Sequence, residues 1–199
     1  MRKINEIFYS LQGEGHHMGY PSVFIRFSGC NLQCDFCDTS HQEGIYMSDN
    51  DIIHAVNLYR ADWIVLTGGE PSLQIDENFI SALKRATGKK IAIETNGTHI
   101  LPGGIDWVTV SPKSGIGGCP EHDLEVERAD EIKVVDTGQD LESYFSLRCR
   151  REETLMYLQP CYMADPDKRR ENQMRTVRRI FADPRWTLSV QLHRFLGIP

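Results

Sequence analysis

Three cysteines lie within eight residues of one another, at Cys30, Cys34 and Cys37, separated by three residues and then by two. A loop of this length can turn three thiolates toward one small object, and thiolates are ligands of iron–sulfur clusters and of zinc. A structural zinc site or an electron-carrying cluster usually takes four ligands. Three ligands from one loop would leave one metal position open, and chemistry takes place at an open position.

On this spacing alone, two simpler interpretations stay open. The cysteines could be buried thiols without a metal, or they could form a zinc knuckle with a fourth ligand from His16, His17, His41 or Cys119. The other cysteines are dispersed singly at Cys119, Cys149 and Cys161. We interpret these three as structural thiols rather than as ligands of a second cluster.

A second motif, Thr67-Gly68-Gly69-Glu70-Pro71, follows the apolar run Trp63–Leu66 about 30 residues after the cysteines. Its glycines allow the backbone to come close to a ligand. Glu70 could accept a hydrogen bond from an ammonium group or hold the loop in place. The motif is weak evidence by itself, but its place after a strand and after the cysteine loop strengthens it.

The elements that would position these motifs are strands and helices in alternation, which predicts an α/β fold with a mostly parallel sheet. We expect strands at 4–9, 22–27, 63–66, 90–94, 107–110, 131–135, 155–158 and 187–192, and helices at 48–59, 76–86, 140–150 and 165–181. Polar motifs follow four of the strands, at Thr67–Pro71, Glu94–Gly97, Ser111–Lys113 and Gln159–Pro160. Parallel folds place their sites at the carboxyl ends of strands, so we expect a functional face there.

Length and composition limit the class of protein. The 199 residues, 40% hydrophobic and 25% charged, suggest one globular domain over residues 1–199. A net charge of −6 argues against nucleic acid as a partner. No apolar stretch reaches the roughly 18 residues that a membrane span requires. Because the six cysteines do not form a disulfide framework, we expect a reducing cytoplasm.

The cysteine spacing, Phe36 before the last cysteine, and Gly-Gly-Glu-Pro together resemble the radical S-adenosylmethionine (SAM) superfamily. Its three cysteines hold a 4Fe-4S cluster whose open iron takes the methionine moiety of SAM. The chain resembles one family more narrowly, the 7-carboxy-7-deazaguanine synthases, and does so over nearly its whole length. The resemblance rests on the segments Glu6–Gly15, Cys37–Thr39, Thr67–Pro71, Glu94–Gly97, Ser111–Lys113 and Gln191–Gly197, of which Ser-x-Gln-Gly-Glu-Gly is not a general superfamily feature.

This resemblance implies a carbon–nitrogen lyase that works in queuosine and deazapurine biosynthesis. The reaction would contract the ring of 6-carboxy-5,6,7,8-tetrahydropterin to 7-carboxy-7-deazaguanine with loss of ammonia. The implied cofactors are a 4Fe-4S cluster, SAM and Mg²⁺, with a reducing electron donor such as flavodoxin. The implied architecture is a modified or incomplete (βα) radical-SAM barrel that forms homodimers. Such a barrel agrees with a chain shorter than the roughly 250 residues of a complete eight-unit barrel.

The resemblance also assigns roles to residues. Cys30, Cys34 and Cys37 would hold the cluster, and Thr39 would hold Mg²⁺. SAM would be bound by Phe36, Cys37, Asp38, Gly69, Glu70, Ser111, Pro112, Lys113, Gln159 and Pro160. The substrate would be bound by Leu11, Gln12, Gly13, Arg26, Thr67 and Pro199. From the residues alone, Arg26 could equally face solvent and Ser111–Lys113 could equally be a surface turn.

Two rival functions share part of this pattern. A glycyl-radical-enzyme activase shares the cysteine spacing and Gly-Gly-Glu-Pro, but it would bind a partner protein and would lack the Ser-x-Gln-Gly-Glu-Gly opening. A non-enzymatic iron–sulfur or zinc protein would need only the cysteines. The segment Gly115–Glu121 has no role that the sequence predicts.

Overall fold

The computed structural model describes residues 1–37, 39 and 41–199. Their strands form an open nine-stranded sheet in the order β3-β1-β2-β4-β5-β6-β7-β8-β9. Pairing is parallel from β2 through to β9, whereas β1 pairs antiparallel with β2 and β3. The strands are β1 (Arg2–Leu11), β2 (Pro21–Phe27), β3 (Ile45–Met47), β4 (Trp63–Gly68), β5 (Lys90–Thr95), β6 (Trp107–Val110), β7 (Glu131–Asp136), β8 (Leu155–Pro160) and β9 (Thr187–Leu188). The predicted mostly parallel α/β sheet, unclosed like an incomplete barrel, is confirmed.

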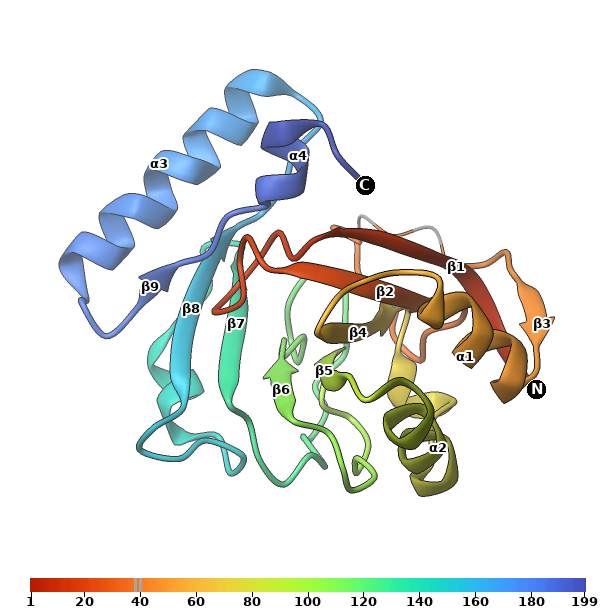
Figure 1. Cartoon of the computed structure of the whole chain (residues 1–199). Coiled ribbons are helices and arrows are strands. Elements are labelled where there is room, and N and C mark those ends of the chain that lie inside the picture. The colour runs from red at the N-terminus through yellow and green to blue at the C-terminus, as the bar shows by residue number, and fades with distance from the viewer. Residues whose placement is uncertain (38, 40) are drawn as a thin grey trace.

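The three longest helices begin at residues whose side chains cap them. In α1 (Asp49–Asn57), the Ser48 side chain accepts from the backbone of Asp51, and the Asp51 side chain accepts in return from the Ser48 backbone. Asp76 caps α2 (Glu77–Thr87), and Asp165 followed by Pro166 opens α3 (Pro166–Ala182). The remaining short helices are η1 (Pro71–Leu73), η2 (Glu142–Ser146) and α4 (Leu192–Leu196). In Figure 1, α1 and α2 lie together on one side and α3 lies beside β8 and β9.

Side chains alternate between the two faces of the sheet, as strand geometry requires. We call the side against α1 and α2 the helix face. It contains the large core, to which the strands contribute Val23, Ile25, Phe27, Ile64, Leu66, Ile91, Ile93, Val108, Val110, Ile132 and Val134. We call the opposite side the pocket face. Its buried apolar cluster is small, consisting of Phe24, Val65 and Ala92 with Phe8, Trp63 and Trp107 packed against it.

The helix predicted at 140–150 is wrong. The structure has only the 3-10 helix η2, with no side-chain cap at its start. Tyr144 and Phe145 pack their rings on Trp186 instead, at centroid distances of 6.3 and 5.1 Å. After η2 the backbone is extended at Leu147, so Leu147 and Cys149 reach the core at a spacing that a helix would not allow.

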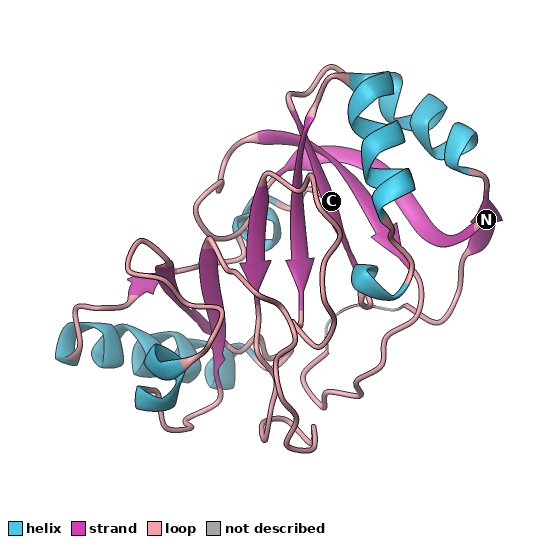
Figure 2. Ribbon diagram, turned by 90° about the horizontal axis from the view of Figure 1, so that it is seen from below, coloured by secondary structure: helices cyan, strands magenta, loops and turns pink. Residues whose placement is uncertain are grey.

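The strand predicted at 187–192 is also wrong after its second residue. Only Thr187 and Leu188 pair with β8, and Ser189 adds a single backbone bond to Leu158. At Leu192 the backbone N–H donates to the Gly13 carbonyl at 2.9 Å, which draws the chain toward the loop after β1. Helix α4 follows at once and ends at Gly197 in the left-handed conformation. In Figure 2, α1 and α2 lie toward one end of the sheet and α3 at the other, with long loops along the rim between them.

Among the described residues, none of the helices has both the length and the apolar character needed to cross a bilayer.

Candidate active site

A cavity of about 560 Å³ opens at the carboxyl ends of the parallel strands. All four strand-end motifs predicted from the sequence contribute to its lining, as does the cysteine loop. Of the predicted site residues, the lining includes Leu11, Gln12, Gly13, Arg26, Cys30, Cys34, Phe36, Cys37, Thr39, Thr67, Gly69, Ser111, Lys113, Gln159, Pro160 and Pro199. The fold therefore gathers in one cavity residues that are separated by most of the chain.

The cysteine loop follows β2 and presents its three thiols to this cavity. All three cysteines are free; Cys30 and Cys34 are half-buried and Cys37 is exposed. The Cys30 thiol accepts a hydrogen bond from the Leu32 backbone N–H at 3.4 Å, and burial raises its pKa. Burial also raises the pKa of Cys34, to about 12, and the neighbouring Cys119 thiol adds to the shift. A metal cluster would have to replace these protons to take the sulfurs as thiolates.

The Thr67–Pro71 loop locks against the cysteine loop through its backbone. Gly69 N–H donates to the Phe27 carbonyl at 3.0 Å, and Glu70 N–H donates to the Gly29 carbonyl at 2.9 Å. Gly68 has a φ of 121°, and a Cβ at Gly68 or Gly69 would collide with the backbone of Phe27 or Gly29. Only glycine allows this contact, which fixes the loop beside the cysteines.

Glu70 is fully buried, and its carboxylate holds the Thr67–Pro71 loop in place through hydrogen bonds. Oε1 accepts from the Ser72 N–H and from the Thr95 hydroxyl, at 3.0 and 2.7 Å, and Oε2 accepts from the Asn96 N–H at 2.7 Å. Of the two roles open to Glu70 from the sequence, this geometry supports holding the loop. A cofactor contact by Glu70 stays a prediction.

The donor set fits a 4Fe-4S cluster. Among residues 1–37, 39 and 41–199, no three Cys, His, Asp or Glu side chains converge on the position of a single metal ion. Ligands of a four-iron cluster bind separate irons and stand further apart, so three soft thiols around a cavity suit it. Two of the zinc ligands considered from the sequence lie elsewhere, at the opposite end of the strands. His16 stacks on the Trp107 ring, and His17 packs edge-on against the same ring.

The Ser111–Lys113 motif stands at the end of β6, on the same side as the cysteine loop. The Lys113 ammonium donates to the carbonyl and to the hydroxyl of Ser111, and it lies 6.0 Å from the centre of the Phe36 ring. Burial lowers the Lys113 pKa. Pro112 is buried and does not reach the cavity lining, so its cofactor contact stays a prediction.

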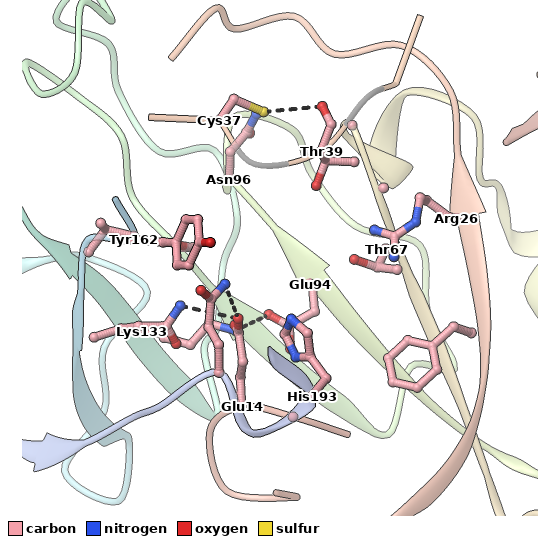
Figure 3. Close-up of a pocket in the computed structure, with 18 of the residues that line it drawn as sticks. Glu14, Arg26, Cys37, Thr39, Thr67, Glu94, Asn96, Lys133, Tyr162 and His193 are labelled. Carbon is pink, nitrogen blue, oxygen red and sulfur yellow. Dashed lines mark hydrogen bonds and ion pairs between the residues drawn. The ribbon is translucent and has the colours of Figure 1, made fainter. Parts of the chain in front are cut away.

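Arg26 and Thr67 are neighbours across the β2–β4 pair and both face the cavity (Figure 3). The Arg26 Nε donates to Glu6 at 2.7 Å, and its guanidinium carbon lies 5.3 Å from the centre of the Phe8 ring. Of the two placements open to it from the sequence, the structure therefore gives the pocket-facing one. Thr39 also lines the cavity, and its carbonyl accepts from the Cys37 thiol at 3.6 Å. Asp38, predicted to bind SAM, lies outside the described residues.

Across the cavity from Cys37 lies an ion network that the sequence did not predict (Figure 3). The Lys133 ammonium donates to Glu14 at 2.6 Å and to Glu94 at 2.8 Å, with Lys133 only 5% exposed. Burial raises the pKa of Glu94 to about 7, against the opposing pull of Lys133. Burial alone would lower the Lys133 pKa, but the carboxylates around it outweigh that effect and raise it. Lys133 therefore stays charged, whereas Glu94 titrates near neutrality.

The loop after β1 and the segment around α4 close this side of the cavity. Gln12 Nε2 donates to Glu94 at 3.1 Å, while Glu14 accepts from Gln159 and Gln191 at 3.2 and 3.0 Å. Pro199 lines the cavity, and its oxygen accepts from the Ser10 hydroxyl at 2.6 Å. His193, Arg194 and Tyr162 line the cavity as well and were not predicted. For this network the sequence held one signal: Lys133 is a charged residue among apolar neighbours in the predicted strand 131–135.

Several proteins similar to this chain carry the same activity name. A sequence model of the radical SAM superfamily matches residues 24–115. The 7-carboxy-7-deazaguanine synthase of Bacteroides thetaiotaomicron is 50% identical, covering 100% of this chain and 99% of the relative. That of Nitratidesulfovibrio vulgaris is 40% identical and covers 99% of both chains.

The crystal structure of QueE from Escherichia coli superposes with a TM-score of 0.76 at 30% identity, covering 96% of this chain and 94% of that one. The likeness therefore spans the fold, the cysteine loop and the segments that close the cavity. This chain belongs to the 7-carboxy-7-deazaguanine synthase family of radical SAM enzymes.

Proposed function

We propose that this chain converts 6-carboxy-5,6,7,8-tetrahydropterin to 7-carboxy-7-deazaguanine with loss of ammonia, as a radical SAM lyase in queuosine biosynthesis. One observation carries the proposal: a single cavity holds the cluster cysteines on one side and the Gln12-Gly13-Glu14 loop on the other. The cluster cysteines are a feature of the radical SAM superfamily, and the Gln12-Gly13-Glu14 loop is a feature of the 7-carboxy-7-deazaguanine synthase family. The whole chain, residues 1–199, would act as one radical SAM domain.

Cys30, Cys34 and Cys37 would hold the 4Fe-4S cluster, and the backbone of Gly68 and Gly69, which line the cavity beside them, would meet the methionine end of SAM. When bound, the cluster and SAM supply the 5′-deoxyadenosyl radical that starts the ring contraction. Ser111 and Lys113 would bind polar groups of the cofactor, and Phe36 would cover it with an aromatic face. Gln159 and Pro160, which line the same cavity, would add further contacts.

The substrate would lie between Arg26 and the loop after β1. The Arg26 guanidinium keeps its terminal nitrogens for a substrate carboxylate while its Nε is held by Glu6. Thr67, beside it on β4, would position the pterin, and the backbone of Leu11 and Gly13 with the Gln12 amide would bind the ring edge. Pro199 would contribute an oxygen from the facing segment, where Ser10 already anchors it.

Glu94 and Lys133 give this side of the cavity one group that can exchange a proton and one that stays charged. A carboxyl group whose pKa is about 7 can hold or release a proton at neutral pH. The reaction expels ammonia, so a nearby exchangeable proton is useful. Lys133 holds both Glu14 and Glu94 in place without moving its own proton.

Thr39 would bind Mg²⁺ together with the substrate, since Mg²⁺ takes oxygen ligands and keeps part of its shell for the substrate. We predict that Thr39→Ala raises the Mg²⁺ concentration needed for half-maximal turnover, while cluster content, read from the visible absorbance, stays unchanged. Thr98→Ala is a matched control on a threonine that does not line the cavity. An unaltered Mg²⁺ response in Thr39→Ala would remove the metal role.

The proposed partners are a low-potential electron donor such as flavodoxin and a second copy of the chain as a homodimer. The cytoplasm is the proposed compartment, because its reducing conditions would keep six free cysteines available. Nucleic acid and membrane are not among the proposed partners.

An anaerobic assay tests the proposal directly. The chain is reconstituted with iron and sulfide, reduced, and supplied with SAM, Mg²⁺ and 6-carboxytetrahydropterin; 7-carboxy-7-deazaguanine is then sought by mass spectrometry. Its formation is the expected result. 5′-Deoxyadenosine without this product would overturn the substrate and keep the radical chemistry. Neither compound from a loaded cluster, or zinc in place of iron, would overturn the function in favour of an activase or a non-enzymatic metal protein.

A further inference from the structure

The Cys34 thiol is in contact with a thiol from another part of the chain. Its Sγ lies 3.0 Å from the Sγ of Cys119, which is separated from it by 85 positions in the sequence. Cys119 is only 5% exposed, whereas Cys34 is half-buried and lines the cavity. No role in the proposed reaction requires a fourth cysteine at this place.

The contact is built into the packing of two loops. The Asp35 N–H donates to the Gly117 carbonyl at 2.8 Å, which holds the cysteine loop against residues 115–119. Gly117 and Gly118 both have a positive φ. A Cβ at Gly117 would enter the Phe36 ring, and one at Gly118 would come within 3.0 Å of the Asp35 carboxylate. The segment therefore fits the cysteine loop closely, and it delivers Cys119 to Cys34.

The other two cluster cysteines have different neighbours. The Cys30 thiol accepts from the Leu32 N–H, and the Cys37 thiol donates to the Thr39 carbonyl. Within the described part of the chain, Cys34 and Cys119 are the two thiols that contact each other. A disulfide has an S–S distance of about 2 Å, so closure would need the two sulfurs to move together by about 1 Å.

We propose that Cys34 and Cys119 form a reversible disulfide when the chain carries no cluster, and that this bond withholds the cysteine loop from iron. The disulfide itself is independent of the proposed function. Its consequence for cluster loading rests on that function, because only a cluster-binding chain loses a ligand when Cys34 is oxidised.

The chemistry balances with a peroxide as oxidant. The accessible Cys34 thiol first gives up its proton, and the thiolate attacks the peroxide O–O bond. Cys34 becomes a sulfenic acid and loses two electrons, and the released hydroxide takes up the proton and leaves as one water molecule. The Cys119 sulfur then attacks the Cys34 sulfur, the S–S bond forms, and the sulfenic oxygen leaves as a second water molecule with the Cys119 proton. A dithiol reverses the reaction by exchange: it takes up the disulfide bond and returns a proton to each cysteine.

Peptide mapping tests the bond. The full chain, prepared without iron, is exposed to hydrogen peroxide, alkylated and digested, with and without later reduction. The expected result is one cross-linked pair of peptides, containing Cys34 and Cys119, that disappears on treatment with dithiothreitol. Cross-links of Cys34 to Cys30 or Cys37 in its place, or Cys34 sulfenic acid with Cys119 still free, would overturn the proposal.

Iron uptake tests the consequence. Oxidised chain supplied with iron and sulfide but no dithiol is expected to lose cluster formation, read at visible wavelengths, and to regain it on addition of dithiothreitol. Without prior peroxide, Cys119→Ser should load its cluster and keep its turnover. After peroxide its Cys34 sulfenic acid has no partner thiol and is oxidised further, so loading should not return on addition of dithiothreitol. Cys149→Ala, which removes another buried thiol, is the matched control and should behave like the parent chain. Equal recovery of loading with dithiothreitol in peroxide-treated Cys119→Ser and in the parent would overturn the role of Cys119.

These outcomes separate the proposal from the function. A Cys34–Cys119 cross-link in a chain that loads iron but makes no 7-carboxy-7-deazaguanine would keep the disulfide and sink the function. Product formation from a chain whose Cys34 never joins Cys119 would do the reverse.

Discussion

The helix face and the pocket face are built from the same strands, yet they differ in almost every physical respect. On β7, Ile132 and Val134 turn toward the helices and are fully buried among apolar side chains. Between them Lys133 turns the other way, into a network of carboxylates. One face buries apolar area, and the other buries charge. The comparison shows that the two faces contribute differently to the free energy of folding. Apolar burial on the helix face stabilises the fold, and charge burial on the pocket face offsets part of that stabilisation.

Burying Lys133 is costly because an ammonium loses its hydration, and only close pairing offsets that cost. The two carboxylates at 2.6 and 2.8 Å provide the pairing. Well-packed apolar residues in place of the whole ion network would stabilise the fold as well, so the presence of these charges indicates a role in the site. Among the described residues, the apolar core side chains of the helix face do not line the cavity, and they pack like an ordinary protein core.

The largest expected effect comes from Lys133→Met, which leaves two partly buried carboxylates without their cation. We expect the free energy of unfolding to fall by about 3–5 kcal/mol and turnover to be lost. Urea denaturation of the cluster-free chain and the anaerobic assay measure the two effects. The double variant Lys133→Met/Glu94→Gln should recover part of the stability and none of the activity. Recovery of activity would show that the charge serves folding alone.

Leu66→Ala tests the helix face, on β4. Leu66 is fully buried on the helix face, so the cavity left behind should cost about 2–5 kcal/mol. We expect kcat and KM per loaded chain to stay unchanged at a temperature where the variant is folded. Thr67→Val, one residue later but on the pocket face, is the matched control: it should raise KM with little loss of stability. Altered kcat or KM in Leu66→Ala, with a large loss of stability in Thr67→Val, would contradict the distinction between the two faces.

The sequence could predict this division in outline, since strand alternation and strand-end motifs are local. Val23, Ile25 and Phe27 alternate with Ser22, Phe24 and Arg26, and the structure places the first set in the helix-face core. The motifs after β4, β5, β6 and β8 meet in one cavity because parallel strands end at the same edge. The resemblance to a known family added residues that no local pattern indicated, such as Pro199.

What the sequence could not predict depends on contacts between distant segments. Glu14 meets Lys133 across 119 positions, and neither residue has a neighbour in sequence that indicates the pair. The 140–150 segment has the composition of a helix, but packing of Tyr144 and Phe145 on Trp186 overrides that preference. Segment 115–119 had no predicted role because its partner, the cysteine loop, lies some 80 residues away.

A smaller effect should follow from Glu94→Gln. The Glu94 pKa is about 7 in the folded chain against 4.5 when unperturbed, so between these pH values the folded chain holds a proton that the unfolded chain has lost. The stability contributed by Glu94 therefore falls as pH rises through this window, by on the order of 2–3 kcal/mol. Gln does not titrate, and the variant should lose this slope. Denaturation midpoints across the window measure it, and an unchanged slope would contradict the assignment.

His17 should give the smallest effect, and one of opposite sign. Its ring lies 4.3 Å from that of Trp63 and 4.7 Å from that of Trp107, and burial there lowers its pKa to about 4. Between this value and 6.5 the unfolded chain binds the extra proton, so the stability contributed by His17 rises with pH and is complete above 6.5. His17→Phe should keep the aromatic packing, remove this rise, and leave turnover unaltered. Because the Glu94 and His17 windows overlap, the parent chain shows only their difference; the two single variants separate them. A turnover defect in His17→Phe would mean that the aromatic end of the pocket face takes part in the chemistry at the other end.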